Sequence, residues 1–388
     1  MALAAIITNM TNKPLSAKDS QLFLGDVKGE QLDVLEYDIE KDLLVSGPAG
    51  SGKTVLALKR YKHLVEKGMN GELLVYTNIL KDYISQKTGV HSKGIFKFIK
   101  DITPVHFNDF LNRAERYLTY ADDAANWARQ NRNAIDFLIV DEAQDLYLSL
   151  FDFCSNYAKV LNLLADDAQQ LYKHGNCTTV ILGKLLKNNN RVIKRLDIKG
   201  NYRNHEVVSK MANPFYSKRN EEPFKWNTFD TRPNLKVDVI VSNSDDILNN
   251  VLIKKTGYYV DLTPQNTSKV AIITQNGVNS INNIFNPYYP THLTNNGMYN
   301  GKNIFETADP VILTMHSVKG LEFEYVLIAN LDYTRLKTEF SENYNQMIFT
   351  AMTRARHSLS IFVKDDQQEF LHLITSNVDK RYYEIIKV

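Results

Sequence analysis

The chain has 388 residues, of which 44% are hydrophobic and 23% are charged, and its formal net charge is +2. This length and composition are typical of a globular protein with two or three domains, and they exclude a disordered, highly charged chain. The small net charge excludes a uniformly basic surface, so a surface for nucleic acid would have to be local.

The cysteines and the apolar segments bear on the cellular compartment in which we expect the protein. Cys154 and Cys177 do not form a metal-spaced pair, so we expect neither a zinc site nor a disulfide scaffold. No stretch approaches the length of about 18 apolar residues that a membrane span needs. The first residues, MALAAIITNM, lack the pattern of a signal peptide, and we interpret them as a strand or a loose arm. We therefore expect a cytoplasmic protein.

Residues 31–42 (QLDVLEYDIEKD) predict a helix that begins with Gln31. A glutamine amide presents a donor and an acceptor side by side, so it can pair with the edge of an adenine base. A glutamine exposed on the surface is the alternative, and it would be favoured if no nucleotide motif followed.

Such a motif follows at residues 43–54 (LLVSGPAGSGKT), where a short apolar strand meets a glycine-rich turn. Glycines allow the backbone to turn tightly around a polyphosphate, and the helix behind adds its positive end. Lys53 can reach the β- and γ-phosphates, and the Thr54 hydroxyl can bind Mg²⁺. A chance glycine-rich turn is disfavoured by the strand before the motif and the helix after it. The glycines of the motif are Gly47, Gly50 and Gly52.

Strands and helices alternate after this loop. Residues 71–78 (GELLVYTN) predict a strand that ends in Thr77 and Asn78, and residues 79–86 and 105–130 predict helices. This alternation predicts a parallel α/β sheet with ligands at the carboxyl ends of its strands.

Residues 136–145 (DFLIVDEAQD) predict a buried strand that ends in two carboxylates. Asp141 suits the coordination of Mg²⁺, and Glu142 suits a general base that polarises the attacking water. The alternative is an acidic helix start, since Asp and Glu favour the first turn. The phosphate loop upstream favours the catalytic interpretation.

Residues 160–172 (VLNLLADDAQQLY) repeat the pattern of a strand followed by acidic residues. Gln169 could sense the γ-phosphate or orient water, although alone it would be a loop residue. Residues 173–203 are rich in Lys and Arg, and we expect them to bridge two domains. Their charge is as typical of a solvated helix face as of a segment that tracks a phosphate backbone.

The second half predicts further strands at 236–242 and 269–277, then a long polar loop over 276–309 whose tyrosines could stack on bases or pack on the body. A strand, a loop and a second strand follow over 311–331, and a helix and a strand over 346–364. Arg203 and Arg354 have no local acidic partner. Arginine suits bidentate phosphate contact and transition-state charge.

The order of these motifs resembles that of the superfamily 1 helicases of the UvrD/Rep/PcrA type. The resemblance covers most of the chain, from residue 31 to residue 357. The matching stretches are GPAGSGKT, LLVYTN, FLIVDEAQD, ADDAQQLY, GNYRN, LTMHSVKGLEF and FTAMTRAR.

The resemblance implies two RecA-like α/β domains, with ATP and Mg²⁺ in the cleft between them and single-stranded DNA across their tops. We expect the first domain at 1–180 and the second at 181–388, with a modest polar insertion around 276–309. The implied activity is a DNA-dependent ATPase that translocates from 3′ to 5′ on a single strand and can unwind duplex.

The resemblance also implies roles for individual residues. Gln31 would read adenine, Tyr202 would stack on it, Glu322 would meet the ribose, and Gln169 would couple the γ-phosphate to DNA. Residues of the nucleotide site would be Gln31, Gly47, Gly50, Gly52, Lys53, Thr54, Tyr202, Gly320 and Glu322. Catalytic residues would be Glu142, Gln169, Arg203 and Arg354, the arginines acting as fingers from the second domain. Thr54 and Asp141 would hold Mg²⁺. The DNA track would comprise Thr77, Asn78, Tyr172, Thr314 and His316.

Three positions depart from the family pattern. Ala165 stands where the family has glycine, Val55 replaces an arginine that often follows the phosphate loop, and no tryptophan follows Tyr172. The gaps after Asn78 and after Arg203 are also too short for large accessory domains. We therefore hypothesise a minimal motor that needs a protein partner for specificity or strand separation.

A second interpretation is a nucleotide-gated regulatory ATPase or DNA sensor within a larger complex, for instance beside a nuclease in repair or antiphage defence. The missing tryptophan and the missing domains favour this alternative, whereas the catalytic residues favour the motor. RNA remains open as the substrate, because backbone contacts report little about the sugar.

Overall fold

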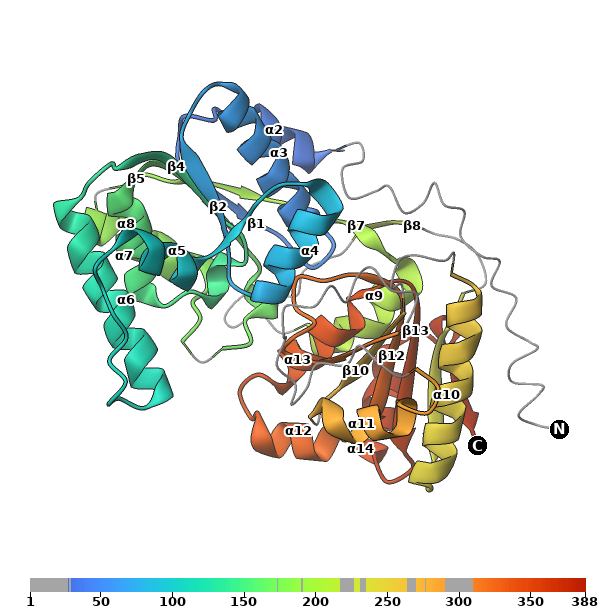
Figure 1. Cartoon of the computed structure of the whole chain (residues 1–388). Coiled ribbons are helices and arrows are strands. Elements are labelled where there is room, and N and C mark those ends of the chain that lie inside the picture. Colours follow the sequence, from blue (N-terminus) through green and yellow to red (C-terminus); the bar gives the residue numbers. More distant parts are fainter. Residues whose placement is uncertain are drawn as a thin grey trace. The chain divides into compact units, whose positions relative to one another are not determined.

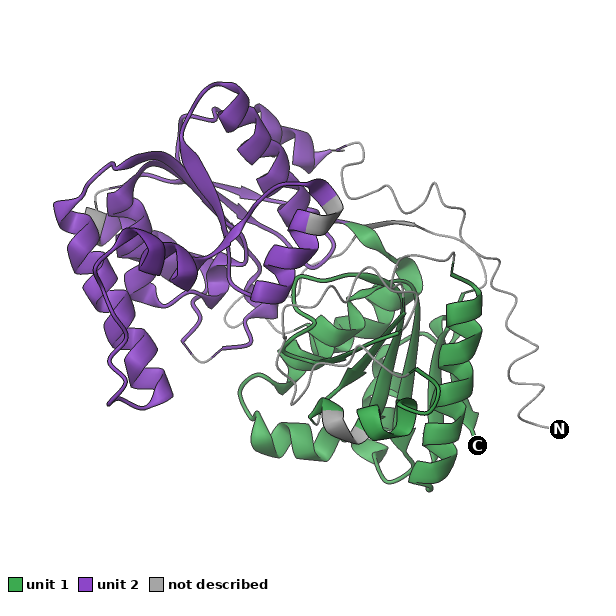
Figure 2. Cartoon of the chain, in the orientation of Figure 1, with its two compact units in different colours: residues 1–22, 202–217, 226–388 green, residues 23–201, 218–225 purple. Residues whose placement is uncertain are grey.

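The computed structural model describes residues 27, 29–172, 174–189, 191–216, 227–230, 235–263, 270–275, 277–289 and 310–388. The chain forms two compact units, coloured separately in Figure 2. Unit 2 comprises residues 23–201 and 218–225, and unit 1 comprises residues 1–22, 202–217 and 226–388.

Unit 2 is built on a six-stranded sheet with the order β3-β2-β4-β5-β1-β6, in which all neighbours are parallel. Parallel strands are covered on both faces, which is why they read as nearly continuous apolar runs such as FLIV and VLNLLA. The strands are β1 (Leu43–Ser46), β2 (Gly71–Val75), β3 (Lys93–Gly94), β4 (Ile135–Val140), β5 (Ala158–Ala165) and β6 (Lys194–Asp197).

Helices join these strands, as Figure 1 shows, and α6 packs on α7, which in turn packs on α8 and β5. Most of residues 105–130 form the single helix α6, which begins where the Asn112 side chain accepts a hydrogen bond from the Glu115 amide. The helices are α2 (Glu30–Glu36), α3 (Lys53–Glu66), α4 (Asn78–Thr88), α5 (Ile95–Ile102), α6 (Arg113–Gln130), α7 (Leu148–Tyr157) and α8 (Thr178–Asn189), with short 3₁₀ turns η2 (Ala143–Asp145) and η3 (Asp167–Gln169).

The topology of unit 2 places its functional loops at one edge. Strand β1 lies between β5 and β6, with Ser46 beside Ala165, and β4 lies on the other side of β5, with Val140 beside Leu163. The phosphate loop after β1, the acidic pair after β4 and the polar turn after β5 therefore emerge at the carboxyl ends of neighbouring strands, where parallel sheets bind ligands.

Unit 1 is built on a second six-stranded parallel sheet, with the order β11-β10-β12-β13-β9-β14. Its core lies between this sheet and helices such as α10, which packs on β9, β12 and β13. The strands are β9 (Val237–Ser242), β10 (Val270–Thr274), β11 (Val311–Thr314), β12 (Phe323–Leu331), β13 (Ala355–Lys364) and β14 (Tyr383–Lys387).

The described helices of unit 1 are α9 (Glu206–Ala212), α10 (Asp245–Asp261), α11 (Val278–Phe285), α12 (Tyr333–Glu339), α13 (Tyr344–Met352) and α14 (Gln368–Asn377), with η4 (Asn213–Phe215) and η6 (Lys380–Tyr382). Strands β7 (Gly200–His205) and β8 (Asn227–Asp230) form a small separate sheet. The predicted insertion around 276–309 contains α11, and its part from residue 290 onward lies outside the described residues.

The two parallel sheets with their helices confirm the predicted α/β fold of two RecA-like domains. Among the described helices, none is long and apolar enough to cross a membrane.

Candidate nucleotide site and aromatic pocket

The phosphate loop joins the end of β1 to the start of α3 in unit 2. Gly50 and Gly52 adopt positive φ angles of 78° and 87°, a region that side chains disfavour. A Cβ atom on Gly52 would lie 2.3 Å from Gln31 Nε2, and this nitrogen donates to the Ser51 carbonyl over 2.9 Å. The loop is therefore shaped by its glycines and is tied to the buried Gln31 of α2.

Lys53 lies against this loop and is 7% exposed. Its Nζ donates to the carbonyl oxygens of Gly47 and Pro48 over 2.8 and 3.0 Å, and it lies 3.7 Å from Asp166 Oδ2. A phosphate group bound by Lys53 would have to compete with these carbonyls for the ammonium protons.

The acidic pair lies next to Thr54. The Thr54 hydroxyl donates to Asp141 Oδ2 over 2.6 Å, and Asp141 Oδ1 accepts from the Glu142 amide over 3.0 Å. Burial, and secondarily the charge of Glu142, raises the pKa of Asp141 to about 6. Glu142 has a positive φ of 56°, which is rare for a residue other than glycine and marks a specialised turn.

Thr54 and Asp141 are the residues that could hold a magnesium ion. Their hydroxyl and carboxylate oxygens are the hard ligands that Mg²⁺ prefers, and Mg²⁺ commonly takes one or two carboxylates together with substrate phosphates and water. The described residues contain no cluster of three or more His, Cys, Asp or Glu side chains suited to a metal. The donor set thus fits a magnesium ion that binds together with a nucleotide.

Gln144 connects the acidic pair to the turn after β5. Its Nε2 donates to Glu142 Oε2 over 2.6 Å, and its Oε1 accepts from the Asp166 amide over 3.0 Å. Asp166 Oδ2 in turn accepts from Gln169 Nε2 over 2.5 Å. The structure therefore connects the predicted residues Lys53, Glu142 and Gln169 through Gln144 and Asp166, two residues that the sequence analysis did not select. These connections are hydrogen bonds, except that Lys53 joins Asp166 through the ion pair of 3.7 Å.

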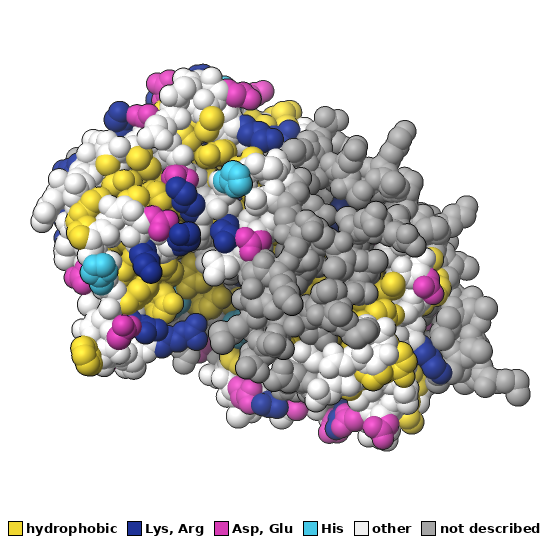
Figure 3. All heavy atoms as spheres, viewed as in Figure 1, with side chains coloured by type: hydrophobic (Ala, Val, Ile, Leu, Met, Phe, Trp, Pro, Cys, Tyr) yellow, Lys and Arg dark blue, Asp and Glu magenta, His cyan; other side chains and the backbone are white. Residues whose placement is uncertain are grey.

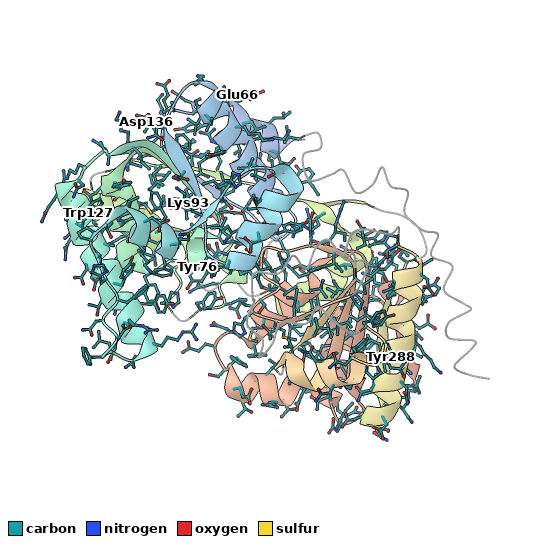
Figure 4. All side chains as sticks on the ribbon, in the orientation of Figure 1. Glu66, Tyr76, Lys93, Trp127, Asp136 and Tyr288 are labelled. Atoms are coloured by element: carbon teal, nitrogen blue, oxygen red, sulfur yellow. The ribbon has the colours of Figure 1, made fainter. Side chains whose placement is uncertain are left out.

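A pocket of about 690 Å³ opens at the end of β2 in the same unit, and Figure 4 marks Tyr76, which directly follows this strand. Three of the predicted DNA residues, Thr77, Asn78 and Tyr172, line this pocket. Figure 3 shows hydrophobic side chains gathered on this face of unit 2 among Lys and Arg side chains. The other lining residues are Tyr76, Gly94, Ile95, Phe96, Lys97, Arg113, Ala114, Tyr117, Tyr147 and His174.

His174 lies in the aromatic wall of this pocket. Its ring stacks on Tyr147 with a centroid distance of 3.8 Å and an interplanar angle of 2°, and its Nε2 lies 3.0 Å from the Tyr76 hydroxyl. Burial lowers the pKa of His174, against a hydrogen bond to the Asp145 backbone that raises it. The His174 ring therefore lies close to the position at which the family has a tryptophan and this chain does not. The sequence analysis did not select His174.

In unit 1, Arg203 has an acidic partner that is not local in sequence. Its Nε lies 2.7 Å from Glu322 Oε2, so two predicted nucleotide-site residues bind each other. Burial would raise the pKa of Glu322, but the charges of Arg203, Arg356 and Arg354 hold it below its ordinary value. The partner comes from the loop before β12, far away in sequence.

Arg354 is almost completely buried, with 1% exposure, at the turn between α13 and β13. Its guanidinium donates to the Thr350 and Leu321 carbonyls over 2.9 and 3.2 Å. The Asn204 amide donates to the carbonyl of Thr353 over 2.8 Å and also to that of Ala355, so the segment that carries Tyr202 and Arg203 is fixed to this turn.

The remaining predicted residues of unit 1 lie in the loop after β11. Thr314 accepts a hydrogen bond from the Ser317 amide over 3.1 Å, and the His316 ring lies 5.6 Å from that of Phe340. Burial lowers the pKa of His316. Gly320 has a positive φ of 77°, so this loop, like the phosphate loop, depends on a glycine.

Two family models match the chain. Residues 40–259 match the Schlafen group 3, DNA/RNA helicase domain, and this match spans more than half of the chain. The chain belongs to this helicase family. Residues 310–362 match the UvrD-like helicase C-terminal domain. No curated protein matches the chain.

These matches confirm the predicted resemblance to a compact superfamily 1-type helicase. The Schlafen helicase match contains the phosphate loop, the acidic pair and the aromatic pocket, and the UvrD-like match contains Thr314, Glu322 and Arg354. Membership of a helicase family implies nucleotide binding and hydrolysis and a nucleic-acid substrate.

Proposed function

We propose that the chain is an ATP-dependent translocase or helicase that couples ATP hydrolysis to movement on single-stranded DNA. One observation carries this proposal. In unit 2, an ion pair joins Lys53 to Asp166, and hydrogen bonds through Gln144 connect Asp166 to Glu142, beside Thr54 and Asp141. A protein that only binds nucleotide has no need of a carboxylate placed as a base next to the magnesium ligands.

The chain's own residues would bind and orient ATP as follows. Backbone amides of the phosphate loop and the Lys53 ammonium would bind the β- and γ-phosphates. Thr54 and Asp141 would hold Mg²⁺, which neutralises phosphate charge when it is bound. Glu142 would accept the proton of the attacking water, and Gln144 would orient the Glu142 carboxylate for that step.

Residues at the two ends of the nucleotide complete the proposed site. Gln31 would recognise adenine, and Tyr202 would stack on it. Arg203 and Arg354 would stabilise the charge of the transition state, and Gln169 would sense the γ-phosphate. Arg203 would first have to exchange its bond to Glu322 for one to phosphate, which leaves Glu322 available to the ribose.

The proposed DNA track comprises Thr77, Asn78 and Tyr172 in unit 2 and Thr314 and His316 in unit 1. The pocket beside the first three has aromatic rings and basic side chains, the combination that binds single strands through stacking and charge. The 3′ to 5′ polarity and the requirement for a protein partner belong to this proposal as well.

Steady-state ATP turnover, measured with and without single-stranded oligonucleotides, tests the proposed function. We expect DNA to raise turnover many-fold, and we expect Arg354→Ala to reduce the DNA-stimulated rate. Matched DNA and RNA oligonucleotides in the same assay identify the preferred sugar, and strand displacement with either overhang tests the polarity. Slow turnover that does not respond to either nucleic acid would contradict the motor.

A nucleotide-gated regulatory subunit is the second candidate function. The short segment between β2 and β4, whose helices and strands are α4, β3, α5 and α6, favours it, because there is no room for a large accessory domain. Partner binding that depends on ATP, together with slow turnover, would separate this candidate from the motor.

A further inference from the structure

We propose that Glu30 is a positioning residue for base recognition: its carboxylate anchors the first residue of β7, the strand that carries Tyr202, and so makes the nucleotide site selective for ATP over GTP. This inference rests on the proposed function, in which Gln31 recognises adenine and Tyr202 stacks on it. It goes beyond that function, because Glu30 acts through the backbone and does not touch the nucleotide.

The anchor consists of two hydrogen bonds to one carboxylate oxygen. Glu30 is the first residue of α2 and directly precedes Gln31. Its Oε2 accepts from the backbone amides of Lys199 and Gly200 over 2.5 and 3.2 Å. Consecutive N–H groups that point at one oxygen form an anion-binding concavity, and a charged acceptor makes such bonds roughly twice as strong as neutral ones. The carboxylate therefore fixes the backbone just beyond the end of β6.

The anchored backbone is the start of the strand that contains the residue proposed to stack on adenine. Strand β7 begins at Gly200, and Tyr202 is its third residue. After Tyr202, the Asn204 side-chain amide donates to the carbonyl of Thr353 over 2.8 Å. The strand is therefore held on both sides of Tyr202, and loss of the carboxylate would release one of these two holds.

The chain before the anchor is fitted to the phosphate loop. The Ile198 amide donates to the Ser46 carbonyl over 2.7 Å, and the Ile198 side chain is buried. A Cβ atom on Gly47 would lie 3.0 Å from the Ile198 carbonyl oxygen, so the loop and Ile198 are in close contact. The two bonds to Glu30 extend this ordered path from the phosphate loop to the first residue of β7.

Helix α2 is a firm base for the anchor. At its C-terminal end, the buried Arg60 donates to the carbonyls of Val34 and Tyr37 over 2.8 and 2.9 Å. In its first turn, Gln31 Nε2 donates to the Ser51 carbonyl over 2.9 Å. The residue that would read the base and the residue that anchors β7 are thus neighbours on one fixed helix. This arrangement sets the distance from the Gln31 amide to the start of the strand.

Base selectivity requires that the base is held in a fixed position opposite the Gln31 amide. Stacking alone tolerates every base, since every base has a π-face. The Ser51 carbonyl can only accept, so it fixes which end of the Gln31 amide faces it. The amide thus cannot turn over to suit guanine, whose edge exchanges the donor and acceptor of adenine, and guanine would leave polar groups unpaired. Glu30 adds the second condition, because it limits where Tyr202 can hold the ring.

A glutamate in the first turn of a helix can also stabilise that helix through its dipole, without any role in base recognition. That role needs the charge, whereas the anchor needs an oxygen at the right distance from two amides. Glu30→Gln keeps the length and an acceptor oxygen but loses the charge. Glu30→Asp keeps the charge but is one carbon shorter. The two variants therefore separate the anchor from the dipole.

The test measures the affinities of the full chain for ATP and GTP by displacement of a fluorescent ATP analogue. We expect Glu30→Ala to weaken ATP binding about tenfold, the effect of losing a hydrogen bond to a charged group. GTP binding should change much less, so the preference for ATP falls. Glu36→Ala, which removes the exposed glutamate at the other end of α2, is the matched control and should keep the wild-type preference.

The conservative variants decide between the two roles of Glu30. We expect Glu30→Gln to keep most of the preference for ATP and Glu30→Asp to lose it. The inference would be overturned by a wild-type preference in Glu30→Ala, by a wild type that does not distinguish ATP from GTP, or by a preference that Glu30→Asp keeps and Glu30→Gln loses.

These binding measurements need neither hydrolysis nor DNA, so they separate this inference from the proposed function. If Glu30→Ala loses the preference for ATP but DNA does not stimulate turnover by the wild type, the proposed function fails and the inference stands. If DNA stimulates turnover by the wild type but Glu30→Ala keeps the preference, the proposed function stands and the inference fails.

Discussion

The side-chain amide of Gln144 donates a hydrogen bond to Glu142 Oε2 over 2.6 Å. This bond fixes the carboxylate that we propose as the general base, two residues away on a turn that requires a positive φ at Glu142. A carboxylate that accepts a hydrogen bond from an amide is held in one orientation. The placement of Glu142 thus depends on the turn of residues 142–145.

Removing the charge of Glu142 should stop hydrolysis without preventing nucleotide binding. We expect Glu142→Gln to lower ATP turnover by about 10²–10⁴-fold, because general-base catalysis contributes that much. Binding of a fluorescent ATP analogue should persist. Glu66→Gln, at an exposed glutamate, is the control and should retain wild-type turnover. A retained rate in Glu142→Gln would assign the base to another residue.

Neutralising Asp141 should stabilise the nucleotide-free protein. Raising its pKa from 3.8 to about 6 corresponds to a cost of roughly 3 kcal/mol for the charged form. The folded state therefore binds more protons than the unfolded state between these pH values, so stability falls as pH rises through this window. We expect Asp141→Asn to raise the free energy of unfolding by about 1–2 kcal/mol at pH 8, since the amide keeps one acceptor oxygen, and much less near pH 4.

Chemical denaturation at both pH values measures this effect. Magnesium-dependent ATP turnover should be lost in the same variant. If Asp141→Asn and the wild type were equally stable at pH 8, burial would not destabilise the charged Asp141 carboxylate in the folded protein.

Arg60 should contribute strongly to the stability of unit 2. This arginine of α3 is 2% exposed, and it donates to the carbonyls of Val34 and Tyr37 over 2.8 and 2.9 Å and to Asn162 Oδ1 over 2.6 Å. We expect Arg60→Met to lower the free energy of unfolding by about 3–5 kcal/mol, because buried acceptors lose their donor.

The apparent affinity for ATP should fall with the same substitution, since α2 carries Gln31. Arg132→Met, at an exposed arginine, should change stability by less than about 0.5 kcal/mol. A small effect of Arg60→Met would show that water replaces the guanidinium.

Two glycines with positive φ offer a matched test of the phosphate loop. Gly52→Ala would combine strain with a Cβ atom 2.3 Å from Gln31 Nε2, whereas Gly68, at φ 78°, has open space around its Cβ position. We expect Gly68→Ala to cost about 1–2 kcal/mol of stability and to leave ATP binding intact. Gly52→Ala should weaken ATP binding at least tenfold in titration with a fluorescent analogue. Equal ATP affinity in the two variants would contradict the assigned role of the loop.

The sequence was sufficient to predict the sheets and the polar residues that lie at the ends of their strands. The run FLIV followed by Asp141 and Glu142, and the run LLVS followed by the glycine loop, predict strands and ligands together, because a parallel sheet collects its strand ends at one edge. Thr77, Asn78 and Tyr172 were selected singly, and the structure places all three at one pocket.

Contacts between distant segments escaped the sequence analysis. Nothing near Arg203 indicates Glu322 as its partner, since the two meet only through the fold of unit 1. The stack of His174 on Tyr147 was missed for the same reason, although the missing tryptophan after Tyr172 was noticed. Gln144 and Asp166 belong to motifs that the sequence analysis identified. The two residues were not selected, because they are joined by a hydrogen bond between the turns that follow β4 and β5. The predicted domain boundary at residue 180 and the residue roles stay predictions.

The central claim is that nucleic acid stimulates ATP hydrolysis by this chain, and phosphate release with and without single-stranded DNA tests it most directly. The account predicts a many-fold increase with DNA in the wild type and no increase in Glu142→Gln. A slow rate that is the same with and without DNA, or an increase that survives in Glu142→Gln, would contradict it.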